Sequence, residues 1–436
     1  MTQEQIEKAV SLVHDVRYGG LPTHFPSLTA WDIAPLSREE QSMLWTESLR
    51  ENPQREAGIY LNIPFCRKKC AFCFLDVKGG SVYEEQEKYI LAAEKEMAFF
   101  APVFAEKEIS CVYIGGGTPN FLPASLLKRI LISLKHYFRI KPGAQISMES
   151  NPDFFDEEKA VAVAECGVSM LLMGIQSFSA TVNRDNGRAQ DVTRIKDAFD
   201  LVRRAGIKHI NADLLCGLKG QTKKDFIRDV LLLSRLRPTQ IHLNRIKSLA
   251  GTLPPEIKKE LYSWQQAGLE ILRRAGYTVL DEESACLDGI RNQQGNYIFH
   301  LDNSLLGLGS GAMSHAWGRL RSRNIVSPAE YSESALSGGA FSQLYMKTGI
   351  EEELIHYLMN TLLHGVTVMP EEVREKFGAA GEVFFRRKAA NMACRGYIEE
   401  SDGGWKCEMR MQDWLGVTAA LYGEEMLERI IRRNGL

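Results

Sequence analysis

Short apolar runs rich in β-branched residues alternate along the chain with longer segments in which apolar residues recur every three or four positions. The first pattern predicts buried strands and the second predicts amphipathic helices. The predicted strands cover residues 58–62, 110–115, 145–149, 170–174, 208–213 and 240–245. The predicted helices between them cover residues 84–102, 123–138, 155–166, 192–205 and 222–236. Strands that alternate with helices predict a parallel sheet with right-handed crossovers.

One helical segment, TRIKDAFDLVRRAG, shows the pattern clearly. Its apolar residues Ile195, Ala198, Phe199 and Val202 fall on one helix face. Gly206 follows at the place where a C-terminal cap belongs. The segment therefore predicts a helix that buries one face and ends at the glycine.

The organisation of the chain is predicted in four parts. They are a mostly helical or irregular lead-in (1–50), a core (51–250), a core extension and connector (251–330), and a C-terminal domain (331–436). The last part predicts helices followed by a hairpin that turns at Gly403 and Gly404, which resembles a winged helix. DNA binding and a lid over the core are both open, and a basic patch of only Arg386, Arg387 and Lys388 favours the lid.

Composition and charge narrow the functional classes. The chain has 436 residues and a net charge of −2, with no tail or stripe of Lys and Arg, which predicts no nucleic-acid partner. Its start carries charges and lacks an apolar stretch, so no signal peptide is expected. No apolar run approaches the roughly 20 residues that a membrane span needs. We therefore expect a cytoplasmic protein without a membrane span.

The nine cysteines fall into two groups. In a reducing compartment they are not expected to form disulfides. Six are scattered and are interpreted as small buried hydrophobes: Cys111, Cys166, Cys216, Cys286, Cys394 and Cys407. The other three, Cys66, Cys70 and Cys73, lie within eight residues, and clustered thiols of this kind most often bind metal or do redox chemistry.

The spacing of the clustered thiols favours iron and sulfur. A structural zinc site needs four ligands, often two cysteine pairs that lie far apart in the sequence. This chain has no second cysteine pair and no His near Cys73. A CxxxCxxC loop suits a 4Fe-4S cluster in which each thiolate takes a different iron. The fourth iron then keeps an open position for a substrate or cosubstrate. A zinc site completed from elsewhere, or a chance trio, is the alternative.

Several motifs in order resemble a known family. The stretch YLNIPFCRKKCAFC, with its CxxxCx-aromatic-C signature at the end of the first predicted strand, is similar to the radical S-adenosylmethionine (SAM) superfamily. It looks more narrowly like the oxygen-independent coproporphyrinogen III oxidase-like family, which includes radical SAM methyltransferases. The supporting motifs are VYIGGGTPNFL (112–122), ISMESNPD (146–153), MGIQSF (173–178), INADLLCGLKGQT (210–222) and LLGLGSGAMSH (305–315).

The resemblance implies a fold and a place for the site. The fold is α/β, a partial open (β/α)6 barrel, with the C-terminal α+β winged-helix-like accessory domain beside it. The motifs mostly lie at or just beyond the C-terminal ends of predicted strands, where barrel-like α/β folds build their active sites.

The resemblance also implies the cofactors and the first group of site residues. The cluster, on Cys66, Cys70 and Cys73, would bind SAM and cleave it reductively to methionine and a 5′-deoxyadenosyl radical. Tyr60 and Glu149 match catalytic positions. Matching SAM-contacting positions are Phe72, Gly115, Gly116, Gly117 and Thr118. Ordinary packing of Tyr60 and Phe72, and a solvated carboxylate at Glu149, are the alternatives.

A second SAM site is implied by further matches. Gln176, Arg188 and Asp213 match second-SAM contacts, and Ile246 matches more loosely. A solvated arginine at a helix start is the alternative for Arg188, because the family normally has Leu-Gly-Arg where this chain has Asn186 before its Gly-Arg.

Departures from the family pattern bear on the reaction. Asn62 stands where His is usual, Phe74 and Leu75 where the oxidases have Gly-Cys, and Lys219 where Pro is usual. We therefore expect C-methylation of an unsaturated, aromatic or tetrapyrrole small-molecule acceptor, with the second SAM as carbon donor.

Two other functions stay open. One is oxidative decarboxylation of the coproporphyrinogen III oxidase type. The other is a haem chaperone, whose candidate ligands are His300 and His315. Reduced flavodoxin or ferredoxin is the implied electron donor for the enzymatic functions.

Overall fold

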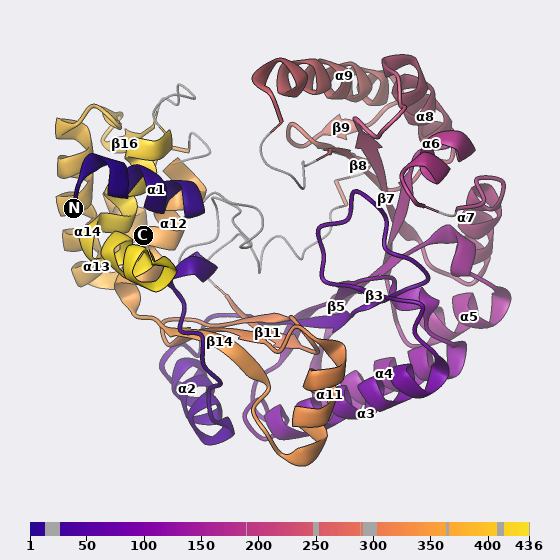
Figure 1. Cartoon of the computed structure of the whole chain (residues 1–436), viewed down its shortest axis with the longest axis horizontal. Coiled ribbons are helices and arrows are strands. Elements are labelled where there is room, and N and C mark those ends of the chain that lie inside the picture. The colour runs from indigo at the N-terminus through magenta and orange to yellow at the C-terminus, as the bar shows by residue number, and fades with distance from the viewer. Residues whose placement is uncertain are drawn as a thin grey trace.

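The computed structural model describes residues 1–13, 27–188, 190–246, 253–287, 289–290, 303–362, 366–407 and 414–435. Across this part of the chain, the main feature is a sheet of 12 strands in the order β14-β13-β12-β11-β1-β4-β5-β6-β7-β8-β10-β9. Figure 1 shows the sheet as an open arc with helices along its outer side. The predicted α/β open barrel is confirmed in outline.

Six neighbouring parallel strands form the centre of the sheet. They are β1 (Ala57–Ile63), β4 (Ile109–Gly116), β5 (Ile140–Ser150), β6 (Met170–Gln176), β7 (His209–Cys216) and β8 (Gln240–Arg245). These are the six strands that the sequence predicts, and β5 begins five residues earlier than the pattern indicates. Parallel strands are buried on both faces, which explains their continuous apolar runs.

Helices cover the outer face. Between the strands lie α3 (Tyr83–Phe100), α4 (Ala124–Tyr137), α5 (Glu157–Glu165), α6 (Ala180–Asp185), α7 (Arg194–Arg204) and α8 (Lys223–Arg235), and α9 (Pro255–Arg274) follows β8. The described residues also form short 3-10 helices, which are η2 (Leu28–Ala30), η3 (Pro119–Phe121) and η4 (Pro152–Phe154). In α8 a capping box between Thr222 and Asp225 satisfies the first amides. Gly206 follows α7 with φ of 100°, as its predicted capping role requires.

Shorter strands extend the sheet at both edges. At one edge β11 (Ser304–Leu308) runs parallel to β1, and β12 (Met313–Ala316), β13 (Leu320–Asn324) and β14 (Ser342–Lys347) follow antiparallel. At the other edge β10 (Ser284–Cys286) and β9 (Thr278–Val279) pair antiparallel. α2 (Arg38–Glu51) and α11 (Pro328–Ser337) complete the packing of the first edge. In the described residues the two edges do not pair, so the barrel stays open.

Alternation along each strand separates two faces. Outward residues such as Ile59, Val112 and Ile210 join the large apolar core with the helices. Inward residues form a smaller cluster of Tyr113, Met170 and Leu172, with the partly buried Tyr60 and Ile290 beside it. Other inward positions of the central strands carry polar side chains.

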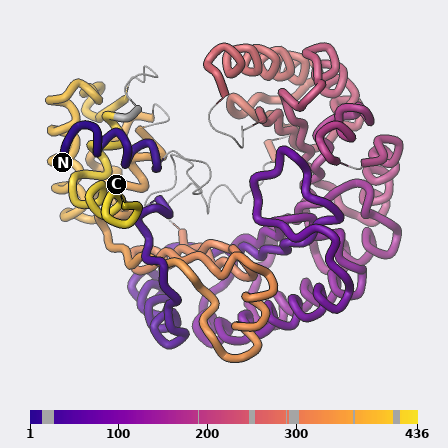
Figure 2. Tube along the Cα trace, in the orientation of Figure 1, coloured from indigo at the N-terminus to yellow at the C-terminus, as the bar shows by residue number. Residues whose placement is uncertain are grey.

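The C-terminal elements pack around a second core. They are α12 (Ile350–Leu362), α13 (Pro370–Cys394), β15 (Glu399–Ser401), β16 (Gly404–Lys406) and α14 (Trp414–Asn434). The N-terminal α1 (Gln3–Val13) packs in the same core, beside α14, and Figure 2 shows the two chain ends together there. The predicted hairpin is present as β15 and β16. Its likeness to a winged helix, and the predicted domain boundaries, stay predictions.

All nine cysteines are free thiols. Five of the six scattered cysteines are buried, but Cys394 is exposed at the end of α13, so its predicted burial is wrong. A helical pattern does not show which face the neighbouring elements cover. None of the described helices is long and apolar enough to cross a lipid bilayer.

Candidate functional site

The three clustered cysteines lie in one loop that follows β1. Cys66 ends β2 (Phe65–Cys66), which pairs with β3 (Lys78–Gly79) and so closes the base of the loop. The amide of Cys73 donates to the carbonyl of Cys70 at 3.1 Å, and all three thiols are half-buried. The sequence therefore places its predicted cluster ligands in a loop that is tied at both ends.

Burial and mutual charge raise the pKa values of two of the clustered cysteine thiols. Burial raises the pKa of Cys66 to about 11, the Thr118 hydroxyl at 3.4 Å opposes the rise, and charge on Cys73 and Cys70 adds to it. Burial also raises the pKa of the Cys73 thiol. Because the thiolate is the form that binds metal, bound iron would hold these groups deprotonated against their burial.

The donor set of the loop is three half-buried free thiols. Cysteine thiolates are the ligands that hold 4Fe-4S groups, and three of them leave one iron open. No three His, Cys, Asp or Glu side chains form a ready site for a single metal ion within the ranges that the structure describes. The donor set therefore fits a 4Fe-4S group by its chemistry, and the choice between this group and zinc stays a prediction.

The glycine motif at the end of β4 packs against the segment that leads to Cys66. The amides of Gly117 and Thr118 donate to the carbonyls of Ile63 and Phe65, both at 2.8 Å. A Cβ at Gly117 would lie 2.6 Å from the Phe65 oxygen, so only glycine fits. These two amides are therefore hydrogen-bonded within the protein. The predicted SAM contacts of Gly115, Gly116, Gly117 and Thr118 stay predictions.

Glu149 lies at the end of β5 on the inward face. One carboxylate oxygen accepts from the Tyr113 hydroxyl at 2.7 Å, and the other accepts from the Gly116 amide at 3.1 Å. Burial raises the pKa of Glu149 to about 7; the hydrogen bond from Tyr113 opposes this, and the charge of Asp213 adds to it. The Glu149 carboxylate is thus held by two donors, not solvated freely. Tyr113 is a site residue that sequence reasoning missed, although it lies inside the quoted glycine motif.

Tyr60 and Asn62 occupy neighbouring inward positions of β1. The Tyr60 hydroxyl donates to Asn62 Oδ1 at 3.0 Å, and Asn62 Nδ2 donates to the Ser310 carbonyl at 2.7 Å. The ring of Tyr60 stacks on Tyr113 with centroids 6.0 Å apart. Tyr113 therefore contacts both Tyr60 and Glu149, and the catalytic role of these two residues stays a prediction.

The residues of the predicted second SAM site gather at the ends of β6 and β7. Gly174 pairs with Asp213 in the strand register, and Arg188 Nη2 donates to the Gly174 carbonyl. Burial raises the pKa of Asp213, while the charges of His242 and Arg188 oppose the rise. Gln176 has φ of 66° and its Oε1 is buried without a partner in the described structure. Gln176, Arg188 and Asp213 therefore lie close together.

Two neighbours of Asp213 were missed from the sequence. His242 on β8 is opposite Asp213 in register, and its Nε2 is buried without a hydrogen-bond partner among the described residues. Asn211, two residues before Asp213, is 1% exposed with both amide atoms unpaired in that same part of the structure. Alternation with period two along a strand already predicted that Asn211 and Asp213 share a face.

The remaining predicted residues are more loosely placed. Phe72 is half-buried in the cysteine loop. Ile246 follows β8, and its amide donates to the Cys216 carbonyl at 2.9 Å. It packs on Gly217, where a Cβ would lie 2.9 Å from the Ile246 side chain. Their contacts with SAM stay predictions.

Asn186 connects the cysteine loop with the loop after β7. Its carbonyl accepts from the Ala71 amide at 2.9 Å, between Cys70 and Cys73. Its side chain donates to the Lys219 carbonyl at 2.9 Å and accepts from the Lys219 amide at 3.1 Å. Two of the departures from the family pattern are thus partners.

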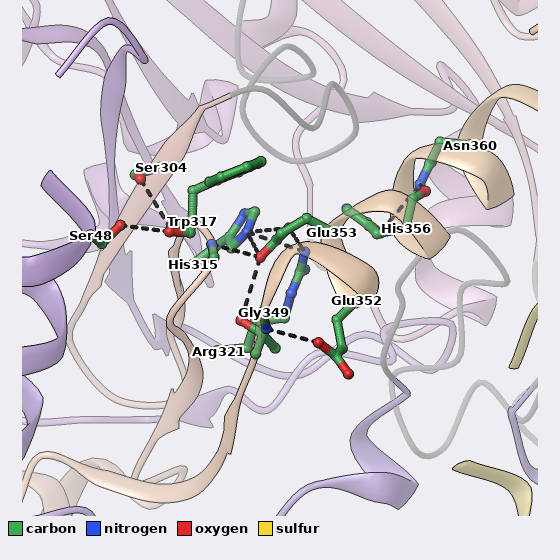
Figure 3. A network of polar contacts seen from close by, with 12 residues as sticks. Ser48, Ser304, His315, Trp317, Arg321, Gly349, Glu352, Glu353, His356 and Asn360 are labelled. Carbon is green, nitrogen blue, oxygen red and sulfur yellow. Dashed lines mark hydrogen bonds and ion pairs between the residues drawn. The ribbon is translucent and has the colours of Figure 1, made fainter. Parts of the chain in front are cut away.

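Of the two candidate haem ligands, only His315 lies among the described residues. His300 lies outside the described residues. His315 on β12 and Arg321 on β13 converge on Glu353 of α12, as Figure 3 shows. Both Glu353 oxygens lie 2.9 Å from His315 Nε2, and one lies 2.9 Å from Arg321 Nη2. Burial opposes ionisation of Glu353, but the charges of His315 and Arg321 hold its pKa below the ordinary value.

Comparisons with known proteins agree with the motifs. Residues 61–233 match the radical SAM superfamily. The chain is 28% identical over 336 residues to an oxygen-independent coproporphyrinogen III oxidase of Salmonella typhimurium, covering 72% of each chain. It is 25% identical over 265 residues to the heme chaperone HemW of Escherichia coli, covering 58% of this chain and 69% of that one. The solved structure of coproporphyrinogen III oxidase (HemN) from Escherichia coli superposes with a TM-score of 0.73 at 21% identity, over 96% of this chain and 98% of that one.

Proposed function

We propose that the protein is a radical SAM enzyme that oxidatively decarboxylates a porphyrinogen side chain without oxygen, and the match of residues 61–233 to the radical SAM superfamily supports this. The observation that carries the proposal is one continuous segment at the site. Gly116 donates to Glu149, and Thr118, two residues later, contacts Cys66. The glycine motif therefore links the cluster loop to the carboxylate. Similarity to coproporphyrinogen III oxidases over 72% of the chain supports the substrate class.

Each group of residues has a task in this proposal. Cys66, Cys70 and Cys73 would hold a 4Fe-4S group, which supplies the electron for reductive cleavage of SAM when bound. Glu149 and Tyr60 offer oxygen acceptors to a cationic ligand beside that loop. Gln176, Arg188 and Asp213 would bind a second SAM, as the resemblance implies. The electron donor is proposed to be reduced flavodoxin or ferredoxin, in the cytoplasm.

The test is anaerobic turnover with the reconstituted protein, dithionite, SAM and coproporphyrinogen III. We expect 5′-deoxyadenosine, methionine and carbon dioxide, with a substrate mass that falls by one carboxyl group and one hydrogen atom for each side chain converted. Cys66→Ala should abolish all three products, while Cys111→Ala should leave them. An intact cluster that cleaves SAM but leaves the porphyrinogen unchanged would contradict the substrate assignment.

Methyl transfer is the second candidate function, and one observation favours it. The side chains that follow Cys73 are exposed, with Phe74 at 55% and Leu75 at 39%, where the oxidases have Gly-Cys. Exposed apolar groups beside the cluster loop suit an aromatic acceptor other than the oxidase substrate. A methyl transfer would yield S-adenosylhomocysteine together with 5′-deoxyadenosine. Oxidation yields carbon dioxide and no S-adenosylhomocysteine, so product analysis separates the two.

Haem handling is the weaker alternative despite the similarity to HemW. His315 Nε2 already lies against Glu353 and Arg321, so this nitrogen is not free to bind iron. Titration with haem should therefore give the same Soret spectrum for the wild-type protein and for His315→Ala. A Soret shift that His315→Ala abolishes would favour the chaperone.

A further inference from the structure

Asn62 is fixed on several sides beside the cluster loop. Its side chain is 9% exposed and bonds Tyr60 and Ser310. Its backbone carbonyl accepts from the Tyr89 hydroxyl at 2.7 Å, and Tyr89 in turn accepts from the Ser310 amide at 2.9 Å. A Cβ at Gly116 would collide with Asn62 Oδ1, so the amide group is also packed against that glycine.

These contacts determine which way the Asn62 amide faces. The Ser310 carbonyl can only accept, so the NH2 group must face it at 2.7 Å. Oδ1 is then directed at Tyr60, 3.0 Å away. A flipped amide would place two oxygens against each other at Ser310, in a buried position where an unpaired acceptor is unfavourable.

The direction of the Tyr60 proton follows from the amide. Asn62 Oδ1 accepts, so the phenol donates its single proton to Asn62 and keeps its lone pairs for another partner. Within the described residues no donor reaches those lone pairs. The neighbouring Glu149 carboxylate is acceptor-only when ionised, and lone pairs remain on both oxygens beside the single bonds from Tyr113 and Gly116. This part of the inward face therefore presents acceptors, which suit a cationic ligand.

We propose that Asn62 is a positioning residue that holds Tyr60 as an acceptor and thereby makes the site prefer a cationic sulfonium ligand over its neutral thioether analogue. The inference rests on the proposed function, in which the ligand is SAM. S-adenosylhomocysteine lacks the sulfonium charge and keeps the rest of the molecule, so the ratio of the two affinities isolates the effect.

The test is anaerobic isothermal titration of the reconstituted protein with SAM and, separately, with S-adenosylhomocysteine. Asn62→Leu removes the acceptor, so the phenol can turn its proton toward the ligand. A hydrogen bond to a charged group contributes about 1.5–3 kcal/mol, so the affinity ratio should fall roughly ten- to hundred-fold. Tyr60→Phe should lower the ratio to a similar degree, and adding Asn62→Leu to Tyr60→Phe should change it no further.

Tyr89→Phe is the matched control. It removes the hydrogen bonds of Tyr89 to Asn62 and Ser310 without touching the Asn62 amide, so it should loosen the fold and leave the ratio unchanged. Equal weakening of both ligands in Asn62→Leu would overturn the inference, as would a fall that persists without the Tyr60 hydroxyl. A wild-type protein that binds neither ligand would overturn the proposed function itself, which is a different result.

Discussion

The pairing of Asn186 with Lys219 gives a prediction that can be worked out in free energy. Leu218, Lys219, Gly220 and Gln221 form a turn in which Gln221 donates to the Leu218 carbonyl at 2.9 Å. Gly220 has φ of 77°, as the third residue of a type II turn requires. Lys219 is then the second residue, a position that favours proline. Lys219→Pro should therefore fit the backbone and remove only the amide that Asn186 accepts.

The cost of each change follows from the contacts. Asn186→Leu removes two hydrogen bonds to Lys219 and one to the Val182 carbonyl at 2.8 Å, at a net cost of about 0.5–1.5 kcal/mol each. Lys219 is exposed, so water can replace its two bonds. Lys219→Pro leaves Asn186 Oδ1 unpaired at a residue that is 3% exposed, which costs roughly 1–3 kcal/mol. The stiffer unfolded chain offsets about 0.4–1 kcal/mol of that loss.

The double variant Asn186→Leu with Lys219→Pro has neither the buried acceptor nor its donor. Its loss of stability should be smaller than the sum of the single losses by about 1–2 kcal/mol. Urea denaturation of the cluster-free protein in reducing buffer measures this through midpoints at constant slope. Asn183→Leu is the matched control, because Asn183 is equally buried but donates to the Ser177 carbonyl, so its effect should add to that of Lys219→Pro.

Additive losses in the Asn186 cycle, within about 0.5 kcal/mol, would refute the pairing. The cycle has a functional readout as well. The Asn186 backbone carbonyl, which accepts from the Ala71 amide in the cysteine loop, is kept in Asn186→Leu, but the side-chain hydrogen bonds to Lys219 that hold this residue in place are lost. Asn186→Leu should therefore release reconstituted iron to a chelator faster than wild type. Unchanged iron release would show that the Asn186 side chain does not steady the loop.

Three other predictions concern the cluster and two buried carboxylates. Alanine at Cys66, Cys70 or Cys73 should each abolish the iron and sulfide content of reconstituted protein, and Cys407→Ala should not; a triple variant with full iron would contradict the ligand assignment. Burial raises the pKa of Glu96 to about 7, although hydrogen bonds from Gly309, Tyr331 and Asn324 oppose the rise. Between pH 4.5 and 7 the folded chain therefore binds more protons than the unfolded chain. Its free energy of unfolding should fall as the pH rises through this range, by an amount on the order of 3 kcal/mol. Urea midpoints of Glu96→Gln should lack that fall, and parallel pH profiles would refute it. Arg321→Leu leaves the buried Glu353 with one charged partner fewer and should lower the free energy of unfolding by about 3–5 kcal/mol. The control Arg323→Leu, on the same strand, breaks a partly exposed ion pair with Asp76 and should cost about 0–1 kcal/mol. Equal losses of Tm in the two variants would show that the buried network does not stabilise the fold more than the exposed pair.

The sequence predicts the parts of the fold that depend on neighbouring residues. The apolar runs predicted all six central strands, and the cysteine spacing predicted a loop whose thiols suit iron and sulfur. The sequence does not predict which residues far apart along the chain contact one another. Asn62 bonds Ser310, which is 248 positions away, and although both residues lie in quoted motifs, no local pattern indicates that they meet. The packing of α1 against α14 was missed for the same reason.

Departures from a family pattern can mislead when each is considered alone. Asn186 alone weakens the assignment of Arg188, and Lys219 alone has no explanation. In the structure the Asn186 side-chain oxygen accepts a hydrogen bond from the Lys219 N–H, which a proline would lack. The two differences therefore depend on one shared contact, and they carry less information about the reaction than two independent changes would.

The two halves of the inward face are prepared for ligands to different degrees. On β1, β4 and β5 the polar groups are satisfied within the protein, since Asn62, Tyr113 and Glu149 are all bonded there. On β6, β7 and β8, Gln176 Oε1, both amide atoms of Asn211 and His242 Nε2 are buried without partners among the described residues. Each such atom costs roughly 1–3 kcal/mol, a cost that a polar ligand could remove. The first half is therefore preorganised beside the cluster loop, and the second half is completed by what binds there, so variants of Asn211 and His242 should change ligand affinity more than variants of their apolar neighbour Leu172.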